Sequence, residues 1–328
     1  MTYTIRQAAP SDIRPALDLA MRVFMEFEAP VYGPEAPGNF MRDVVTNEPF
    51  IKNCARGTCL LFVALDCSRI VGVIGERHSG EDGHICILFV DRACHRQGIA
   101  AALTERMVCA LKLRGHDTVT VNSSPYALPF YRCFGFTETG PEQKLDGFIF
   151  TPMTYTPGEI WDVYDRDRNK TGRYTERGRP MATGDYHIVV HVWKRNKRGE
   201  WLIDKRTPRR QNDRWGGLWE TTGGSALAGD DSLAAALRET KEELGITLKP
   251  RKGLLFRSDA REIEGHTWFQ DAWVFACDGP AEAVTFQPGE TCDAMWVSSA
   301  KLREMMAAGE LLGYDVYPYF DELLEAYP

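Results

Sequence analysis

Blocks of apolar residues along the first half of the chain predict a mixture of helices and strands. Apolar positions at helical spacing predict helices, the first of them capped at Ser11-Asp12, over residues 11–27, 99–112 and 130–134. Runs rich in β-branched and aromatic residues predict strands over residues 59–65, 70–76, 85–90 and 118–121, and from Phe136 onward. The run Ile85–Val90 is apolar throughout, which is typical of a buried strand.

The second half repeats this mixture. Strands are expected over residues 186–193, 201–205, 253–257, 267–276 and 294–297. Helices are expected over residues 232–244, 299–308 and 319–326. Between the halves, the stretch TPMTYTPGE at residues 151–159 has two Pro, a Gly and few large apolar residues, which predicts a linker. We therefore expect two α/β (α+β) domains, residues 1–155 and 156–328.

Composition narrows the class of function. The 328 residues suggest two domains, and the 44% apolar and 26% charged content is typical of globular proteins. The net charge of −7 argues against nucleic acid as a main partner. The chain has no apolar run long enough to span a membrane and no signal-peptide pattern at its start. Nine cysteines without a C-x-x-C motif indicate a reducing compartment, so we expect a cytoplasmic protein; its oligomeric state stays open.

The segment Gly224–Ile246, GSALAGDDSLAAALRETKEELGI, holds acidic residues at set spacings in a frame of Gly and Arg. On a helix that ends at Gly245, Glu239, Glu242 and Glu243 stand at i, i+3 and i+4, so their carboxylates share one face. Carboxylates this close repel one another unless a cation neutralises them, and Mg²⁺ prefers carboxylate oxygens together with water and phosphate. A solvated charged helix face is the alternative interpretation, but it does not explain the glycine frame.

This segment resembles the Nudix box, G-x5-E-x7-R-E-U-x-E-E-x-G-U, in which U is aliphatic. It departs from the box at Asp230, where the family has Glu, and at Thr240, where the family has an aliphatic residue. The resemblance implies an α/β/α sandwich that hydrolyses a diphosphate linked to another moiety, with Mg²⁺ or Mn²⁺. Glu239 is also a candidate base, and Arg238 would orient a box carboxylate. The metal ligands implied are the carbonyl of Gly223 and the side chains of Glu239, Glu242, Glu243 and Glu290, with Asp293 as a second choice to Glu290.

A further likeness concerns the branch of the family. Residues 162–178 and 186–193, DVYDRDRNKTGRYTERG and YHIVVHVW, resemble the branch that includes isopentenyl-diphosphate isomerases. The isomerase reaction needs a Cys and His ligands before the box, and Trp219–Ser225 has neither, so hydrolysis is favoured over an isomerase-like activity. His187 falls at a ligand position of that branch, although a structural role is the simpler interpretation. The candidates for clamping a base or diphosphate, with a solvated basic loop as the alternative, are Trp215, Trp219, Arg209, Arg210 and Arg214.

In the first half, the buried strand leads through DRACHRQGIA into a helix. Backbone N–H groups at a helix N-terminus beside Gly and Arg can hold a pyrophosphate, although a Gly in such a turn often serves geometry alone. The loop resembles the acetyl-CoA pyrophosphate loop of the GNAT superfamily of N-acetyltransferases, Q/R-x-x-G-x-G/A, with His95 in place of Gln or Arg. Residues 121–136, VNSSPYALPFYRCFGF, resemble a later block of the same superfamily.

The GNAT resemblance implies a mixed sheet with flanking helices and acetyl-CoA as co-substrate. Asn122 would lie where two strands diverge, and Tyr131 would protonate the departing thiolate, with a core aromatic role as its alternative. Glu76 is a guess for the general base. Leu88, Phe89 and Val90 would bind the pantetheine arm through their backbone. The pyrophosphate would be held by His95, Arg96, Gln97, Gly98, Ile99 and Ala100.

Together these features predict a bifunctional enzyme, a Nudix hydrolase fused to an acetyltransferase. Its partners would be a small-molecule diphosphate and an unidentified amine, without nucleic acid or membrane. One alternative keeps the hydrolase but makes the first domain a module that binds CoA or acetyl-CoA as a sensor or presents substrate. Another makes the Nudix fold bind a nucleotide without cleaving it.

Overall fold

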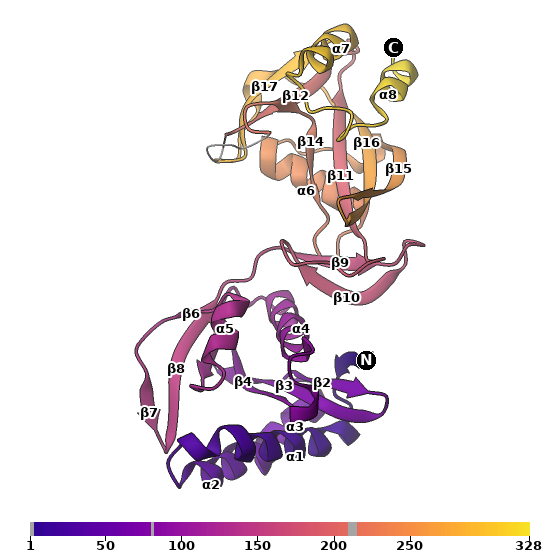
Figure 1. Cartoon of the computed structure of the whole chain (residues 1–328). Coiled ribbons are helices and arrows are strands. Elements are labelled where there is room, and N and C mark those ends of the chain that lie inside the picture. The colour runs from indigo at the N-terminus through magenta and orange to yellow at the C-terminus, as the bar shows by residue number, and fades with distance from the viewer. Residues whose placement is uncertain (1–2, 80–81, 209–214) are drawn as a thin grey trace. The chain divides into compact units, whose positions relative to one another are not determined.

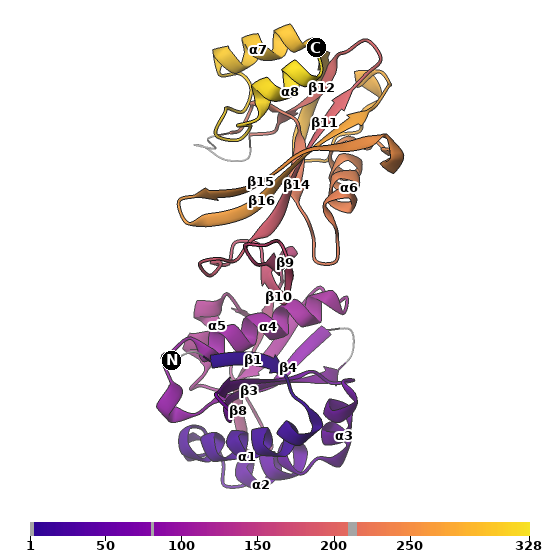
Figure 2. The same cartoon turned by 90° about the vertical axis from the view of Figure 1, so that its right-hand side faces the viewer.

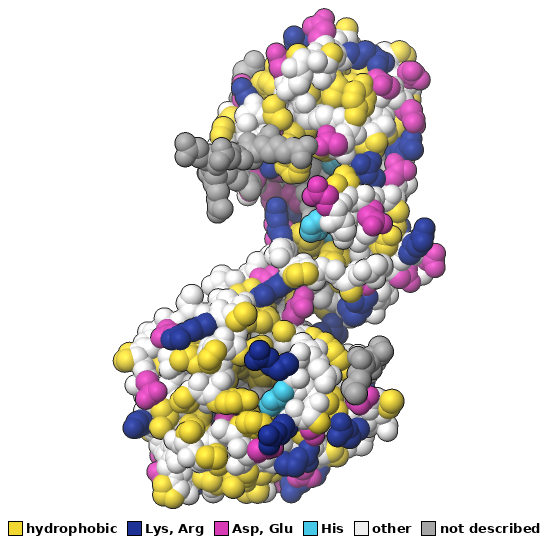
Figure 3. Space-filling model, in the orientation of Figure 1, with side chains coloured by type: hydrophobic (Ala, Val, Ile, Leu, Met, Phe, Trp, Pro, Cys, Tyr) yellow, Lys and Arg dark blue, Asp and Glu magenta, His cyan; other side chains and the backbone are white. Residues whose placement is uncertain are grey.

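The computed structural model describes residues 3–79, 82–208 and 215–328, and the chain forms two compact units (Figure 1). Unit 1 comprises Met1–Ile160 and Tyr174–Gly178, and unit 2 comprises Trp161–Arg173 and Arg179–Pro328. Among the described residues, no helix is long and apolar enough to cross a membrane. On the face seen in Figure 3, positive and negative side chains are interspersed over both units.

Unit 1 is built on a mixed sheet with the strand order β1-β2-β3-β4-β5-β8-β6, and β7 pairs with β8. The strands are β1 Tyr3–Gln7, β2 Leu61–Asp66, β3 Arg69–Ser79, β4 Asp82–Val90, β5 Val119–Ser123, β6 Thr137–Glu138, β7 Gln143–Leu145 and β8 Phe148–Tyr155. β4 and β5 are parallel, but they pair only from Gly83 to Ile85 and from Val119 to Val121. The remainder of β4 therefore diverges from β5, as expected for a sheet that opens beside Asn122.

Helices cover both faces of this sheet (Figure 2). They are α1 Pro10–Phe27, α2 Ala36–Phe40, α3 Glu48–Arg56, α4 Ile99–Leu113 and α5 Leu128–Phe134, with the π-helix η2 Met41–Val45 and the short 3₁₀ turns η1 Ala29–Val31 and η3 Arg92–Cys94. Alternate residues of β2 divide between two cores: Leu61 and Val63 pack with α1 to α3, while Phe62 and Ala64 pack with α4. This alternation is the two-residue period of a strand that is buried on both faces.

Unit 2 is an α/β/α sandwich, as the resemblance to the Nudix box implies. Its sheet has the order β13-β12-β11-β16-β15, with β14 paired to β11 and β17 paired to β12. The strands are β11 His187–Arg195, β12 Trp201–Arg206, β13 Trp219–Glu220, β14 Thr222–Ser225, β15 Gly253–Ile263, β16 His266–Ala276 and β17 Thr291–Val297. Helix α6, Ser232–Leu244, packs on one face, and α7 Ser299–Ala308 and α8 Phe320–Ala326 pack on the other (Figure 2). Two short turns are η4 Pro250–Lys252 and η5 Ala281–Ala283.

The expected linker at residues 151–159 is wrong in its first half, because Thr151–Tyr155 forms the end of β8 and pairs with β5. Pro152 is tolerated there since its carbonyl still accepts a hydrogen bond from the Thr139 N–H at 2.9 Å. Two further strands, β9 Ile160–Tyr164 and β10 Lys170–Glu176, form a two-stranded sheet that the sequence analysis missed. The other elements it missed are β1, α2, α3, β7, β8, β13 and β14.

Candidate functional site

Local sequence places the acidic helix of unit 2. The Asp231 side chain caps α6 by accepting a hydrogen bond from the Ala234 N–H at 2.7 Å. The helix ends at Gly245, whose φ of 68° lies in the left-handed region that Gly adopts without strain. The predicted bounds of this helix, residues 232–244, are therefore confirmed, and Glu239, Glu242 and Glu243 all lie on it.

The box glycine brings α6 against β14. A Cβ atom added at Gly224 would lie 2.2 Å from the carboxyl carbon of Glu239, so no larger residue fits without displacing that carboxylate. At the neighbouring Gly223, an added Cβ would stand 2.8 Å from the carbonyl oxygen of Val190. Both glycines thus permit a close approach, and they place the Glu239 carboxylate beside the backbone of β14.

Arg238 connects the acidic groups of the box. Its guanidinium donates to Asp230 Oδ2, Glu239 Oε1 and Glu242 Oε2, at 3.0 Å each. It also donates to the carbonyl oxygen of Ser225 at 2.9 Å. The shorter Asp230 side chain therefore still reaches a box residue, namely Arg238. Arg238 therefore contacts two box carboxylates, and its role in orienting them stays a prediction.

Beneath the box lies a buried group of charges that the sequence analysis missed. Lys194 and Asp204 are fully buried and form an ion pair at 3.5 Å, and both hydrogen-bond to the Thr222 hydroxyl. Glu220 pairs with Arg206 at 2.8 Å, and burial together with the charge of Asp204 raises the pKa of Glu220 to about 7. A Lys and an Asp inside the apolar strand runs VVHVWK and WLIDK were the available signal.

Glu243 joins this buried group. Burial, followed by the negative charges of Asp204, Glu220 and Glu239, raises the pKa of Glu243 well above its usual value, and Lys194 offsets only part of this. Among the described residues, Glu243 Oε2 and Asp204 Oδ2 are buried without a hydrogen-bond partner. Buried oxygens of this kind are rare in folded proteins, so each calls for an explanation.

These residues fit a divalent cation. Such a cation would neutralise the buried carboxylates and would bind a buried oxygen, such as Glu243 Oε2, that has no hydrogen-bond partner among the described residues. In the conformations seen across the three described ranges, no three His, Cys, Asp or Glu side chains stand close enough to hold a metal ion. The ligand set of Glu239, Glu242 and Glu243 with the Gly223 carbonyl therefore stays a prediction. Glu290 lies in the loop before β17, where its backbone carbonyl accepts from the Thr207 N–H at 2.8 Å, and its role also stays a prediction.

The remaining candidates of unit 2 lie in different surroundings. His187 stacks on Trp161, with ring centroids 4.2 Å apart, a contact that agrees with a structural role. The Lys205 ammonium lies 5.5 Å from the ring centroid of Trp219, and Trp215 is exposed. Asp293 pairs in register with Lys205 on β12. The proposed basic clamp of Arg209, Arg210 and Arg214 lies outside the described residues.

In unit 1, the predicted pyrophosphate loop runs from β4 through η3 into α4. Arg96 and Gly98 have φ angles of 62° and 81°, so the chain turns through left-handed conformations just before the helix begins at Ile99. His95, the departure from the family pattern, donates from Nε2 to the carbonyl oxygen of Val90 at 2.8 Å. Its side chain therefore links the loop to the end of β4. Gln97 lies in the turn before α4, and Ala100 lies in the first turn of that helix.

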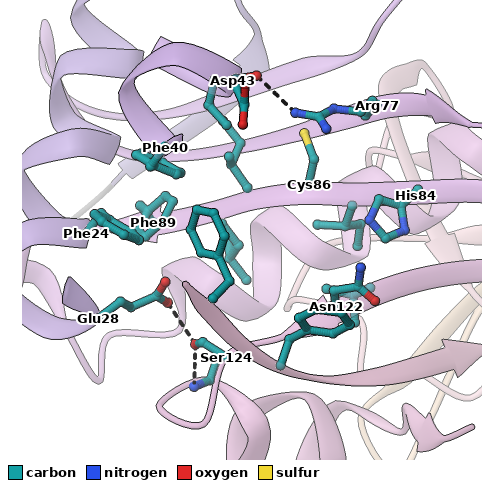
Figure 4. A pocket seen from close by; sticks show the side chains of 18 of the residues that line it. Phe24, Glu28, Phe40, Asp43, Arg77, His84, Cys86, Phe89, Asn122 and Ser124 are labelled. Carbon is teal, nitrogen blue, oxygen red and sulfur yellow. Dashed lines mark hydrogen bonds between the residues drawn. The ribbon is translucent and has the colours of Figure 1, made fainter. Parts of the chain in front are cut away.

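A cavity of about 310 Å³ opens in unit 1 where β4 and β5 diverge (Figure 4). Four residues of the predicted site line it: Leu88, Phe89, Asn122 and Tyr131. Tyr131 is 3% exposed and also packs edge-on against Phe130, so it is both a core aromatic and part of the cavity wall. Burial, and then the charge of Glu28, raises the pKa of Tyr131, which keeps its hydroxyl protonated.

The guess that Glu76 is a base at a strand end is wrong in its placement. Glu76 lies within β3, is 1% exposed, and accepts a hydrogen bond from the Leu60 N–H at 3.3 Å. It also pairs with Arg114 at 3.6 Å and is not among the residues that line the cavity. Glu28, which does line the cavity, was missed because it follows an ordinary amphipathic helix in the sequence.

Comparison with known proteins finds two families in the chain. The family model described as an acetyltransferase (GNAT) domain matches residues 28–157, and the NUDIX domain model matches residues 185–319. An uncharacterised Nudix hydrolase of Listeria monocytogenes is 34% identical over 157 residues, which cover 48% of this chain and 89% of that protein. Nudix hydrolase 3 of Arabidopsis thaliana is 30% identical over 179 residues, 51% of this chain and 23% of that protein.

Solved structures also resemble part of the chain. The PaiA N-acetyltransferase of Thermoplasma acidophilum, solved in complex with coenzyme A, is 18% identical with a TM-score of 0.41. The match covers 48% of this chain and 99% of that protein.

Proposed function

Since the chain belongs to the Nudix hydrolase family and also contains a GNAT acetyltransferase domain, we propose that it is a bifunctional enzyme. Unit 2 hydrolyses a diphosphate linked to another moiety, with Mg²⁺ or Mn²⁺. Unit 1 transfers the acetyl group of acetyl-CoA to an amine. The nine free cysteines support a reducing compartment, so we propose a cytoplasmic location.

The observation that supports hydrolysis best is the excess of carboxylates around Glu243, whose Oε2 is buried without a hydrogen-bond partner among the described residues. In this proposal Glu239, Glu242 and Glu243 hold the cation with the Gly223 carbonyl and Glu290. A cation bound there would screen the diphosphate and acidify a bound water. Because phosphoryl transfer leaves little covalent work to the protein, its residues mainly position charge.

The chain's own residues have distinct parts in this proposal. Arg238 holds Glu239 and Glu242 in place through its 3.0 Å contacts, and Asp230 fixes Arg238 from the other side. Glu239, beside the β14 backbone, is the candidate to take a proton from the attacking water. Gly224 is required because any side chain there would push the Glu239 carboxylate out of position.

Acetyl transfer is supported by the left-handed turn at Gly98 and by the cavity beside the open edge of β4. The loop His95–Ala100 would hold the pyrophosphate through backbone N–H groups at the start of α4. Leu88 to Val90 would bind the pantetheine arm, with Asn122 beside the opening. Tyr131 would give its proton to the departing thiolate.

The hydrolase is tested with a diphosphate panel of nucleoside triphosphates, ADP-sugars, dinucleotides, CoA and isoprenoid diphosphates, supplied with Mg²⁺ or Mn²⁺. We expect phosphate or nucleotide release from at least one class, and its loss in Glu242→Gln. Conversion of isopentenyl diphosphate to its isomer would instead support the isomerase-like alternative. Turnover that is equal in wild type and Glu242→Gln would contradict the assignment of the carboxylates.

A further inference from the structure

The cavity of unit 1 contains a carboxylate to which the proposed mechanism assigns no part. Glu28 follows the last residue of α1, where its backbone N–H still donates to the Phe24 carbonyl at 2.9 Å. The helix end therefore holds its side chain on the cavity wall, facing the loop that follows β5 (Figure 4). Its position is fixed by packing, because Phe24 belongs to the core between α1 and the sheet.

Among the residues that the structure describes, the hydrogen-bond donors to the Glu28 carboxylate are neutral hydroxyl groups. The Ser124 hydroxyl donates to Oε1 at 2.8 Å, and the Tyr32 hydroxyl donates to Oε2 at 3.5 Å. Within the part of the chain that the structure describes, no Lys, Arg or His forms an ion pair with Glu28. Asp43, a second carboxylate on the cavity wall, is paired with Arg42 at 2.7 Å. A carboxylate removed from water and lacking a cation favours a positively charged occupant.

Aromatic rings form the wall beside Glu28. Phe24 stacks on Phe40 with ring centroids 4.3 Å apart, and Phe148 meets the Tyr32 ring edge-on at 5.5 Å. All four line the same cavity, which is small enough to limit the occupant to a compact molecule. Ring faces attract cations and pack against apolar groups, so the wall suits an ammonium ion on an apolar body.

Glu28 and Tyr131 face the same cavity. The charge of Glu28 is the second cause, after burial, of the raised pKa of Tyr131. Burial raises the pKa of Glu28 itself, and the hydrogen bonds from Ser124 and Tyr32 offset part of that effect. A carboxylate that binds protons more tightly than usual is a better general base.

We propose that Glu28 receives the ammonium group of the acetyl acceptor and takes up its proton, and that the acceptor is a primary amine on a compact apolar body. This inference rests on the proposed acetyl transfer and adds to it the class of acceptor and the base. Glu28 accepts one proton from the ammonium, which leaves a neutral amine. The nitrogen attacks the thioester carbonyl carbon, so that the C–N bond forms and the C–S bond breaks.

The electron pair of the broken bond stays on sulfur, and the thiolate takes a proton from Tyr131. Tyr131 regains a proton from the nitrogen of the new amide, and the proton on Glu28 passes to solvent when the product leaves. No oxidant, reductant or further reactant is needed.

The test uses the full chain with acetyl-CoA and three amines: phenethylamine, spermidine and a lysine-containing peptide. We expect phenethylamine to be acetylated with the highest kcat/KM, and Glu28→Gln to lower that value by about 100-fold, in the range typical of a lost general base. Glu26→Gln is the matched control, because Glu26 lies in the last turn of α1, two residues before Glu28, but is exposed and paired with Arg92 at 2.7 Å. We expect it to act as wild type, and both variants to bind acetyl-CoA with unchanged affinity.

Calorimetry with phenethylamine and its uncharged analogue 2-phenylethanol tests binding apart from turnover. We expect wild type to prefer the amine and Glu28→Gln to lose that preference. Equal binding of the two compounds by wild type, or equal kcat/KM in Glu28→Gln and Glu26→Gln, would overturn the role of Glu28. Faster acetylation of spermidine or the peptide would overturn the acceptor class. If wild type binds acetyl-CoA and prefers phenethylamine but acetylates no amine, the acetyl transfer fails while the ammonium site stands.

Discussion

The two units hold their carboxylates in opposite ways. In unit 2, Glu239 and Glu242 share one arginine, and Glu243 lies near Asp204 and Glu220 in a buried group of mixed charges. In unit 1, Glu28 lies among aromatic rings, and among the described residues its hydrogen-bond donors are two hydroxyl groups, whereas Asp43 on the same cavity wall is paired with Arg42. A crowded set of carboxylates suits a small divalent cation, whereas a carboxylate that lies among rings and has no paired cation suits an organic ammonium ion.

The comparison also shows what each site demands of its surroundings. Around the Nudix box the backbone must come close, which explains Gly223 and Gly224. Around Glu28, side chains from segments that are distant in the sequence shape the cavity. The first kind of site leaves a motif in the sequence, and the second does not.

The largest effect is expected from a substitution among the crowded carboxylates of the Nudix box. Replacing Glu239 with Gln removes one negative charge beside the box, and we expect kcat for diphosphate hydrolysis to fall by about 1000-fold or more, since charge positioning dominates this chemistry. Phosphate release with Mg²⁺ measures it. Glu304→Gln is the control, because Glu304 lies exposed on α7 and pairs with Lys301 at 3.4 Å. Equal loss in the control would mean that the fold, and not the site, was damaged.

A second prediction separates transfer from binding in unit 1. Tyr131→Phe removes a buried hydroxyl but keeps the ring that packs against Phe130 and Phe136. We expect acetylation to slow by about 100-fold, as for a lost general acid, while acetyl-CoA binds as before. Stopped-flow detection of the free thiol measures the rate. If acetyl-CoA binding instead changes hydrolysis in unit 2 and no amine is acetylated, the sensor alternative is favoured.

A third prediction tests whether the close approach of the backbone at Gly224 is needed for hydrolysis. Gly224→Ala adds a methyl group 2.2 Å from the Glu239 carboxyl carbon, so the carboxylate must move. We expect hydrolysis to fall by about 10- to 100-fold, because a displacement of about 1 Å at a catalytic group costs that much. Gly38→Ala, where the added methyl group meets no atom within 4 Å, should leave hydrolysis unchanged.

The fourth prediction concerns the turn before α4. Gly98→Ala forces a side chain into a φ of 81°, which costs about 1–2 kcal/mol and should lower acetyl-CoA affinity about 10-fold. Gly115→Ala imposes a similar φ of 91° just beyond the other end of the same helix, with open space around it. Titration calorimetry should show weaker binding in the first variant alone. Equal affinities would rule out the loop as the pyrophosphate site.

The smallest effect is expected at Thr240, which stands where the Nudix box has an aliphatic residue. Its side chain is fully buried, and its hydroxyl donates to the Ala236 carbonyl one turn earlier at 2.8 Å. Thr240→Val restores an aliphatic residue of similar size. The Ala236 carbonyl loses the hydroxyl donor but keeps its place in the hydrogen-bonded backbone of α6. We expect the free energy of unfolding to change by less than about 1 kcal/mol and hydrolysis to stay the same. Urea denaturation checks the first point, and a loss above that limit would mean that the hydroxyl is structurally required.

Much of the fold could be predicted because the residues that begin and end its helices are local in the sequence. The bounds of α6 and α7 follow from the caps Asp231 and Ser298 and from the glycines that end both helices. β10, KTGRYTE, was missed because it is polar and mostly exposed, so its pattern does not mark a strand, whereas β9, IWDVY, is mostly buried and its apolar residues were an available signal. Pro152 was interpreted as a breaker, yet a strand tolerates it where only its carbonyl is needed.

The candidate sites divide in the same way. The carboxylates of α6 could be placed from sequence because helical spacing puts them on one face. Asp204 lies in a predicted strand and Lys194 directly follows another, but their pairing depends on how β11 and β12 are aligned. Glu28 and Ser124 are 96 residues apart and meet only when α1 packs against the sheet. No local pattern encodes that contact.

The measurement that tests the central contrast most directly is titration of Mn²⁺ into the full chain, followed by calorimetry, for wild type, Glu243→Gln and Glu28→Gln. Wild type should bind Mn²⁺ saturably, and Glu243→Gln should weaken that binding at least about 10-fold because a ligand charge is lost. Glu28→Gln should bind Mn²⁺ as wild type does. Equal Mn²⁺ binding by all three proteins, or a loss confined to Glu28→Gln, would contradict the account.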